Sequence, residues 1–262
     1  MPKNAFFVHF GKAAGSYVNV YIFRKIFLDE DFLTKYIPAY YNNWWSRTDL
    51  KDESYKKYLF TANEERRDFF KEELKDISTL KDERVKFCQC HHNNVDSEII
   101  NFFKKNDWYT FTFLRNPKDL ICSLYFFSKK TFKKSGYSAL GPLGSLSGNS
   151  LLKLDFVEPD QDHPSLDTFI NRLLDNKVYH IFWALPDYLK ELDFVKEFSD
   201  KNFSSLTDKL YGHWHDKIPK KNTTCNLGYE FYLKNGYISE ETNRKLVNHE
   251  EYLKYSEYIN LI

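Results

Sequence analysis

The chain has 262 residues, which is long enough to bury the core of one α/β domain. Its 38 Lys and Arg residues nearly balance its 37 Asp and Glu residues, which argues against a general binder of nucleic acids or anionic membranes. Four cysteines are too few for a disulfide scaffold and favour a reducing compartment. Without a signal-peptide pattern or an apolar run of about 20 residues, the sequence predicts a cytoplasmic protein with no membrane span.

The first part of the chain is expected to form a strand, a small-residue turn and a helix. Ala5 to Phe10 is an apolar run that stops at Gly11, and a periodic apolar segment runs from Tyr17 to Phe27. The N–H groups at the start of such a helix are unpaired and, with the helix dipole, form an anion site. Lys12 adds a positive charge and the Ser16 hydroxyl adds another donor.

The middle of the chain alternates between strand and helix patterns. A polar, aromatic stretch over 29–84 contains a capping-box pattern at Thr61–Glu64 that predicts a helix. This alternation favours an α/β fold with a central parallel sheet of about five strands, flanked by helices in three layers. The expected elements here are strands over 85–90 and 108–114 and helices over 63–77, 96–105 and 117–130.

The composition changes between residues 135 and 150, where four of the nine glycines lie. This composition predicts a loop, either an active-site cover or a passive surface segment. No internal repeat or domain linker is recognisable, so we expect a single domain over 1–262. The later elements are expected to be helices over 164–174, 186–190 and 204–211, a strand over 194–198, a loop over 217–228 and one amphipathic helix over 239–262.

The loop after the first strand is not a Walker A motif. That motif, G-x-x-x-x-G-K-[ST], places the Lys after the second Gly, whereas here Lys12 precedes Gly15. No acidic residue obviously follows a strand to hold Mg²⁺. Read alone, the loop is as compatible with a plain structural turn as with an anion site.

A second candidate phosphate site follows the strand expected over 108–114. Arg115 comes at the carboxyl end of this strand, where parallel sheets bind ligands. Ser123 lies eight residues later, two turns into the next helix, so the guanidinium and the hydroxyl could hold one phosphate together. The alternative is that Arg115 pairs with a carboxylate and Ser123 is an ordinary helix residue.

In this order, the two motifs resemble the signature of sulfotransferases that use 3′-phosphoadenosine 5′-phosphosulfate (PAPS), closest to the heparan sulfate 2-O- and chondroitin branch. In that family a Lys-containing loop cradles the 5′-phosphosulfate, and an Arg with a Ser eight residues later binds the 3′-phosphate. This chain departs from the family at Gly11 and Ala13–Ala14, where a hydroxyl is lost. The resemblance implies a P-loop-like fold and a donor site made of Lys12, Ala13, Ala14, Gly15, Ser16, Tyr17, Arg115 and Ser123.

The resemblance continues towards the end of the chain. Asp193 to Glu197 resembles the late strand of the family, and His249 to Tyr255 resembles its last helix. Lys221, Asn222 and Thr223 resemble a polar loop that closes over the nucleotide. The segments 29–84 and 135–163 do not join the match and are expected to be insertions or loops on the acceptor side.

The resemblance also implies a histidine base at the end of the strand expected over 85–90. Strand alternation puts Cys88, Cys90 and His92 on one face and His91 on the other, so His91 is slightly favoured and His92 is its close rival. Two other interpretations stay open, a structural pair of histidines and a zinc site. The zinc site lacks a second ligand pair at a fitting spacing, and sulfuryl transfer itself requires no metal.

The predicted function is in-line transfer of a sulfuryl group from PAPS, the co-substrate, to an acceptor hydroxyl on a carbohydrate. Lys12 would stabilise the leaving phosphate, and His91 or His92 would take the proton. Hydroxyls of lipids, small metabolites and protein tyrosines would be equally compatible with the donor motifs. The alternatives are a P-loop-type nucleotide-dependent kinase and a non-catalytic nucleotide- or glycan-binding module of the same fold.

Overall fold

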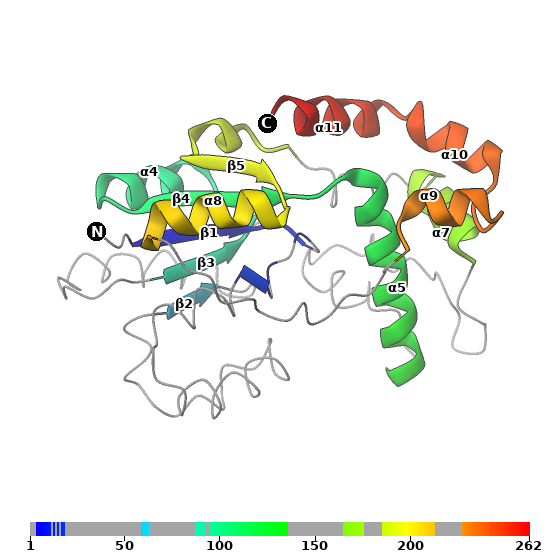
Figure 1. Cartoon of the computed structure of the whole chain (residues 1–262), viewed down its shortest axis with the longest axis horizontal. Helices are drawn as coiled ribbons and strands as arrows, with labels where there is room; N and C mark the ends of the chain where they lie inside the picture. Colours follow the sequence, from blue (N-terminus) through cyan, green and yellow to red (C-terminus); the bar gives the residue numbers. More distant parts are fainter. Residues whose placement is uncertain are drawn as a thin grey trace. The chain divides into compact units, whose positions relative to one another are not determined.

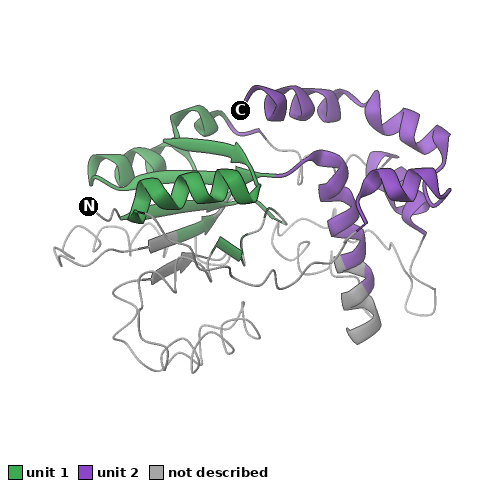
Figure 2. Ribbon diagram, viewed as in Figure 1, with its two compact units in different colours: residues 1–114, 187–222 green, residues 115–186, 223–262 purple. Residues whose placement is uncertain are grey.

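The computed structural model describes residues 4–11, 13, 15, 17–18, 59–62, 87–92, 95–135, 165–175, 185–212 and 227–262 (Figure 1). Figure 2 shows that the chain divides into two compact units. Unit 1 is Met1–Leu114 with Asp187–Asn222, and unit 2 is Arg115–Pro186 with Thr223–Ile262. The single domain expected over 1–262 stays a prediction. No helix within the described residues has the length and apolar character needed to span a bilayer.

Unit 1 is built on a parallel sheet whose strand order is β2-β3-β1-β4-β5 (Figure 1). Each neighbouring pair of strands is parallel, which confirms the α/β class with a parallel sheet. The central strand is fully buried because strands pair with both of its edges and side chains cover both of its faces. The strands are β1 (Ala5–His9), β2 (Leu59–Ala62), β3 (Phe87–His91), β4 (Tyr109–Leu114) and β5 (Phe194–Glu197).

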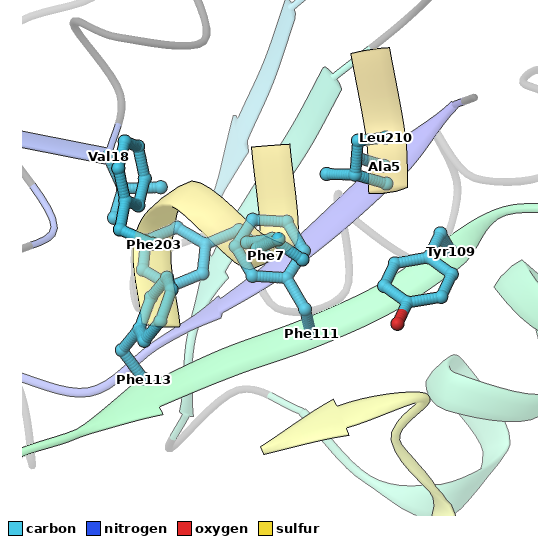
Figure 3. Close-up of a cluster of buried hydrophobic side chains, with 9 residues drawn as sticks. Ala5, Phe7, Val18, Tyr109, Phe111, Phe113, Phe203 and Leu210 are labelled. Atoms are coloured by element: carbon cyan, nitrogen blue, oxygen red, sulfur yellow. The ribbon is translucent and has the colours of Figure 1, made fainter. Parts of the chain in front are cut away.

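Helix α8 (Asp200–Tyr211) covers one face of this sheet through an aromatic cluster (Figure 3). Phe7 of β1 stacks on Phe111 of β4, with ring centroids 5.0 Å apart. The helix begins at Asp200 rather than near 204 because the Ser199 side chain accepts a hydrogen bond from Asn202 N at 3.1 Å and caps it. The buried cluster contains Ala5, Phe7, Val18, Tyr109, Phe111, Phe113, Phe203, Leu206 and Leu210.

Helix α4 (Ser97–Lys105) covers the opposite face, where the alternate residues of β1 point. Phe6 of β1 stacks on Phe103 of α4 with centroids only 3.9 Å apart. The helix begins after Asp96, whose carboxylate accepts a hydrogen bond from Ile99 N at 3.0 Å. A short 3-10 helix, η7 (Asp187–Glu191), joins the same part of unit 1. The sheet therefore has a helix on each face, as the sequence predicts.

The described helices of unit 2 are joined by aromatic contacts and by hydrogen bonds between side chain and backbone. Tyr125 of α5 meets Phe169 of α7 edge to face, with centroids 5.5 Å apart. Asp167 of α7 accepts a hydrogen bond from Ser239 N at 2.7 Å, which fixes the start of α10. The described helices are α5 (Pro117–Ser135), α7 (Leu166–Asp175), α9 (Tyr229–Lys234), α10 (Glu240–Val247) and α11 (Glu250–Leu261).

The single helix expected over 239–262 is wrong, because the chain forms α10 and α11 there. Asn248 ends α10 by donating its backbone N–H to Arg244 O at 3.2 Å. His249 then starts α11, and its side chain accepts a hydrogen bond from Glu251 N at 3.3 Å. Two adjacent polar residues thus cap both new helix ends, which amphipathic spacing alone does not reveal.

Two elements were not predicted, the edge strand β2 and the short helix α9. Thr61 belongs to β2 in the structure, although the sequence predicts it as part of a capping box. The helix expected over 63–77 and the glycine-rich loop over 135–150 lie outside the described residues, apart from Ser135, which ends α5.

Candidate functional site

The turn after β1 is closed by a backbone hydrogen bond from Ala13 N to Phe10 O at 3.2 Å. Gly15, Tyr17 and Val18 are helical, so the strand, turn and helix follow each other as predicted. Such a turn leaves the first N–H groups of the helix available to an anion. Three residues assigned to the donor loop, Lys12, Ala14 and Ser16, lie outside the described residues.

The start of this helix is anchored to the core of unit 1. The Tyr17 ring packs edge to face on Phe203 of α8 and on Phe198, at centroid distances of 5.1 and 5.6 Å. Val18 is completely buried in the same cluster. The turn between β1 and the helix is therefore fixed at both ends by buried residues.

A histidine that sequence reasoning did not select lies against this turn. His9, the last residue of β1, is only 8% exposed. Its imidazole occupies the position that a side chain at Gly15 would need, since an added Cβ would overlap three ring atoms of His9. A signal was present in the sequence, because His9 is a polar residue that interrupts an apolar run directly before a turn.

The histidines proposed as bases stand at the end of the neighbouring strand. His91 closes β3 and is the backbone register partner of His9, and its side chain lies outside what the structure describes. His92 follows it and is buried, with its ring stacked on Phe10 at 4.4 Å. The His92 carbonyl accepts hydrogen bonds from Tyr188 Oη at 2.9 Å and from Val95 N at 3.3 Å.

Tyr188 is suited to hold His92 because it stays protonated. Burial raises the pKa of Tyr188 well above its usual value, and Cys90 and Asp96 raise it further. Its hydroxyl therefore remains a donor to the His92 carbonyl across the physiological range. The position of His92 is thus set by its ring and by its backbone, while the choice between His91 and His92 as the base stays open.

Arg115 and Ser123 lie in unit 2, close to the end of β4 along the chain. Arg115 directly follows Leu114, the last residue of β4, and is partly exposed. Strand β4 runs parallel to β1, with Thr112 opposite Val8, so both strands end at the same edge of the sheet. Ser123 lies within α5 and is only 2% exposed, whereas Arg115 is partly exposed.

The remaining site predictions fall on a part of the chain that the structure does not describe. Lys221, Asn222 and Thr223, predicted to close over the nucleotide, lie outside the described residues. Among the described residues, no group of three or more His, Cys, Asp or Glu side chains could hold a metal ion. The zinc interpretation of the Cys-Gln-Cys-His-His sequence stays open, because the side chains of Cys88 and His91 lie outside the described residues.

The candidate site in unit 1 lies at one edge of the parallel sheet, where β1 leads into a helix start and β3 leads into two histidines. Along the chain, β4 is followed by Arg115, the first residue of unit 2. Ligands of parallel α/β sheets bind at this edge. No family model, curated protein or solved structure matches the chain.

Proposed function

We propose that the protein is a PAPS-dependent sulfotransferase with a P-loop-like fold. One observation carries the proposal: two candidate phosphate sites belong to neighbouring parallel strands that end at one edge of the sheet. The first is the helix start at Gly15, after β1, and the second is Arg115, after β4. A 3′,5′-bisphosphate donor needs two anion sites, only one of which carries the reacting group.

Each donor group has a residue suited to it. The backbone N–H groups around Gly15 and the Lys12 ammonium would hold the 5′-phosphosulfate. Arg115 would bind the 3′-phosphate with two parallel hydrogen bonds, supported by Ser123. The loop that contains Lys221, Asn222 and Thr223 would close over the nucleotide.

The reaction would be a single in-line displacement at sulfur. The acceptor oxygen forms a bond to sulfur while the bond from sulfur to the bridging phosphate oxygen breaks. The acceptor proton passes to His91 or His92, and the negative charge that builds on the phosphate is neutralised by Lys12. A carbohydrate hydroxyl is the proposed acceptor, and the segments 29–84 and 135–163 would shape its site.

The first experiment measures transfer from radiolabelled PAPS to a panel of sugars, lipids, small alcohols and tyrosine peptides. Lys12→Ala is expected to lower the transfer rate about 10²–10³-fold, because it removes one stabiliser of the leaving group. Lys105→Ala, at an exposed position in the last turn of α4, is the matched control and should keep the wild-type rate. An undiminished rate in Lys12→Ala would remove Lys12 from the mechanism.

The second experiment compares nucleotides by thermal unfolding. The product 3′-phosphoadenosine 5′-phosphate (PAP) should raise the melting temperature of the wild-type chain by mass action, and ATP with Mg²⁺ should not. A rise in melting temperature with ATP and Mg²⁺ but not with PAP, together with magnesium-dependent ATP turnover, would favour a kinase. Tight PAP binding without transfer to any acceptor would favour a non-catalytic binding module.

A further inference from the structure

We propose that His9 is a positioning residue, which sets the place of the helix start that receives the phosphosulfate. This inference rests on the proposed function. His9 would not touch the donor; it would act through the backbone at Gly15. Three observations support it: the contact with Gly15, the confinement of the His9 ring, and the link from the next residue to His92.

Gly15 is required for space and not for an unusual backbone conformation. Among the described glycines, positive φ angles occur at Gly212, Gly228 and Gly236 and not at Gly15. An added Cβ at Gly15 would overlap Nε2, Cδ2 and Cε1 of the His9 ring. At Gly11, by contrast, no described atom lies within 4 Å of an added Cβ. The close approach of backbone and imidazole is therefore specific to Gly15.

The His9 ring has little room to move away. It is only 8% exposed, and its centroid lies 5.6 Å from that of the buried Phe7 ring. Its backbone belongs to the central strand, where His9 is in register with His91 of β3. Added volume at residue 15 is therefore expected to displace the helix start, which Tyr17 and Val18 anchor by side-chain packing, before it displaces the strand, which is paired along both edges.

The residue after His9 makes the corresponding contact towards the proposed base. Phe10 is 4% exposed and stacks on the His92 ring with an interplanar angle of 12°. Its carbonyl also accepts the hydrogen bond from Ala13 N that closes the turn. Two consecutive residues thus reach both the donor turn and a candidate base. His9 contacts the turn at Gly15, and Phe10 contacts the His92 ring.

The consequence for binding follows from the chemistry of an N-terminal anion site. Hydrogen bonds from backbone N–H groups to a phosphate oxygen are directional and weaken steeply once the angle is lost. A displaced first turn would therefore weaken PAP binding although every donor group is still present. The effect of a side chain at residue 15 should depend on whether the His9 ring is there.

A double-mutant cycle tests this dependence. PAP affinity and melting temperature are measured for the wild type, Gly15→Ala, His9→Ala and the double variant. We expect Gly15→Ala to weaken PAP binding by about tenfold or more, and we expect His9→Ala in the same chain to restore most of that loss. Gly11→Ala is the matched control and should bind PAP like the wild type. If His9→Ala does not fold, His9→Asn takes its place.

The outcomes separate this inference from the proposed function. Wild-type PAP affinity in Gly15→Ala, or strictly additive losses in the double variant, would overturn the role of His9 while leaving the sulfotransferase proposal intact. A wild-type chain that binds neither PAP nor PAPS would overturn both. In that case the melting temperatures of the four chains would still show whether the His9–Gly15 contact contributes to the stability of the fold.

Discussion

Replacing Asp193 with Asn should destabilise unit 1, because this carboxylate joins three of its elements. Asp193 precedes β5, and its Oδ2 accepts hydrogen bonds from Thr110 N at 2.8 Å and Thr110 Oγ1 at 2.9 Å. Its Oδ1 lies 3.1 Å from Nζ of Lys104 in α4. The same ammonium donates to Glu191 O at 2.7 Å. The carboxylate thus ties the beginnings of β4 and β5 to the end of α4.

The ionised form of Asp193 is the one that favours folding. Burial opposes ionisation, but the hydrogen bonds from Thr110 and the bond and charge of Lys104 outweigh it, so the pKa of Asp193 lies below its usual value. The stabilisation is therefore fully present above the unfolded pKa of about 3.9. It is lost as the pH falls through the lower pKa of the folded state.

The size of the effect follows from the individual contacts. Asparagine keeps one acceptor oxygen but loses the charge, and each hydrogen bond to a charged group contributes about 1 kcal/mol more than a neutral one. Thr110 provides two such bonds. The Lys104 pair is partly exposed and adds about 0–1 kcal/mol. We therefore expect Asp193→Asn to lower the free energy of unfolding by about 2 kcal/mol at neutral pH.

Urea unfolding followed by tryptophan fluorescence and circular dichroism provides the measurement. Wild type, Asp193→Asn and the exposed control Asp187→Asn are compared at pH 7 and at a pH below 3. The difference between wild type and Asp193→Asn should shrink at acid pH, and the control should match the wild type throughout. An equal difference at both pH values would refute the electrostatic reasoning, and no difference at pH 7 would refute the importance of the contact.

Two further changes probe the packing of unit 1. Phe103→Ala should lower the free energy of unfolding in urea by about 3–5 kcal/mol, because it removes a buried ring stacked on Phe6. Phe102→Ala, on the less buried side of α4, should lower it clearly less. Equal costs would contradict the placement of Phe103 in the core. Tyr188→Phe should cost about 1–3 kcal/mol because it leaves the His92 carbonyl without its hydroxyl partner, and unchanged stability would show that Val95 N alone satisfies that carbonyl.

The elements that the sequence predicts well are those with a strong local pattern. β4 ends at Leu114 as expected, since β-branched and aromatic residues continue up to the Arg-Asn-Pro sequence that breaks the strand. α4 begins after Asp96 because the capping carboxylate and the periodic apolar residues agree. In these two segments the local sequence is enough to predict where the element begins or ends.

The elements that escaped prediction depend on contacts far along the chain. β2 has four residues and is defined by its pairing with β3, with Leu59 opposite Phe87. No short sequence window contains that pairing. The break between α10 and α11 depends instead on two caps at neighbouring residues, and either residue is tolerated within a helix.

The candidate site likewise has one feature that the local sequence predicts and one that depends on a contact in the folded structure. The turn after β1 is recognisable from Gly11, the small residues and the change of hydrophobic period. The contact between His9 and Gly15 is not recognisable, because it depends on how closely the helix start approaches the last residue of β1. The donor and base assignments made from the resemblance stay predictions.

The central place of β1 in the sheet also has a consequence for folding during synthesis. Ala5 pairs with Phe87 on one side and with Tyr109 on the other, so both partners of the strand are made long after it. At about 5–20 residues per second, the apolar strand waits on the order of ten seconds for its neighbours. Because both pairings are non-local, the sheet is expected to form slowly, and the unpaired strand is exposed to aggregation or chaperone binding during this interval.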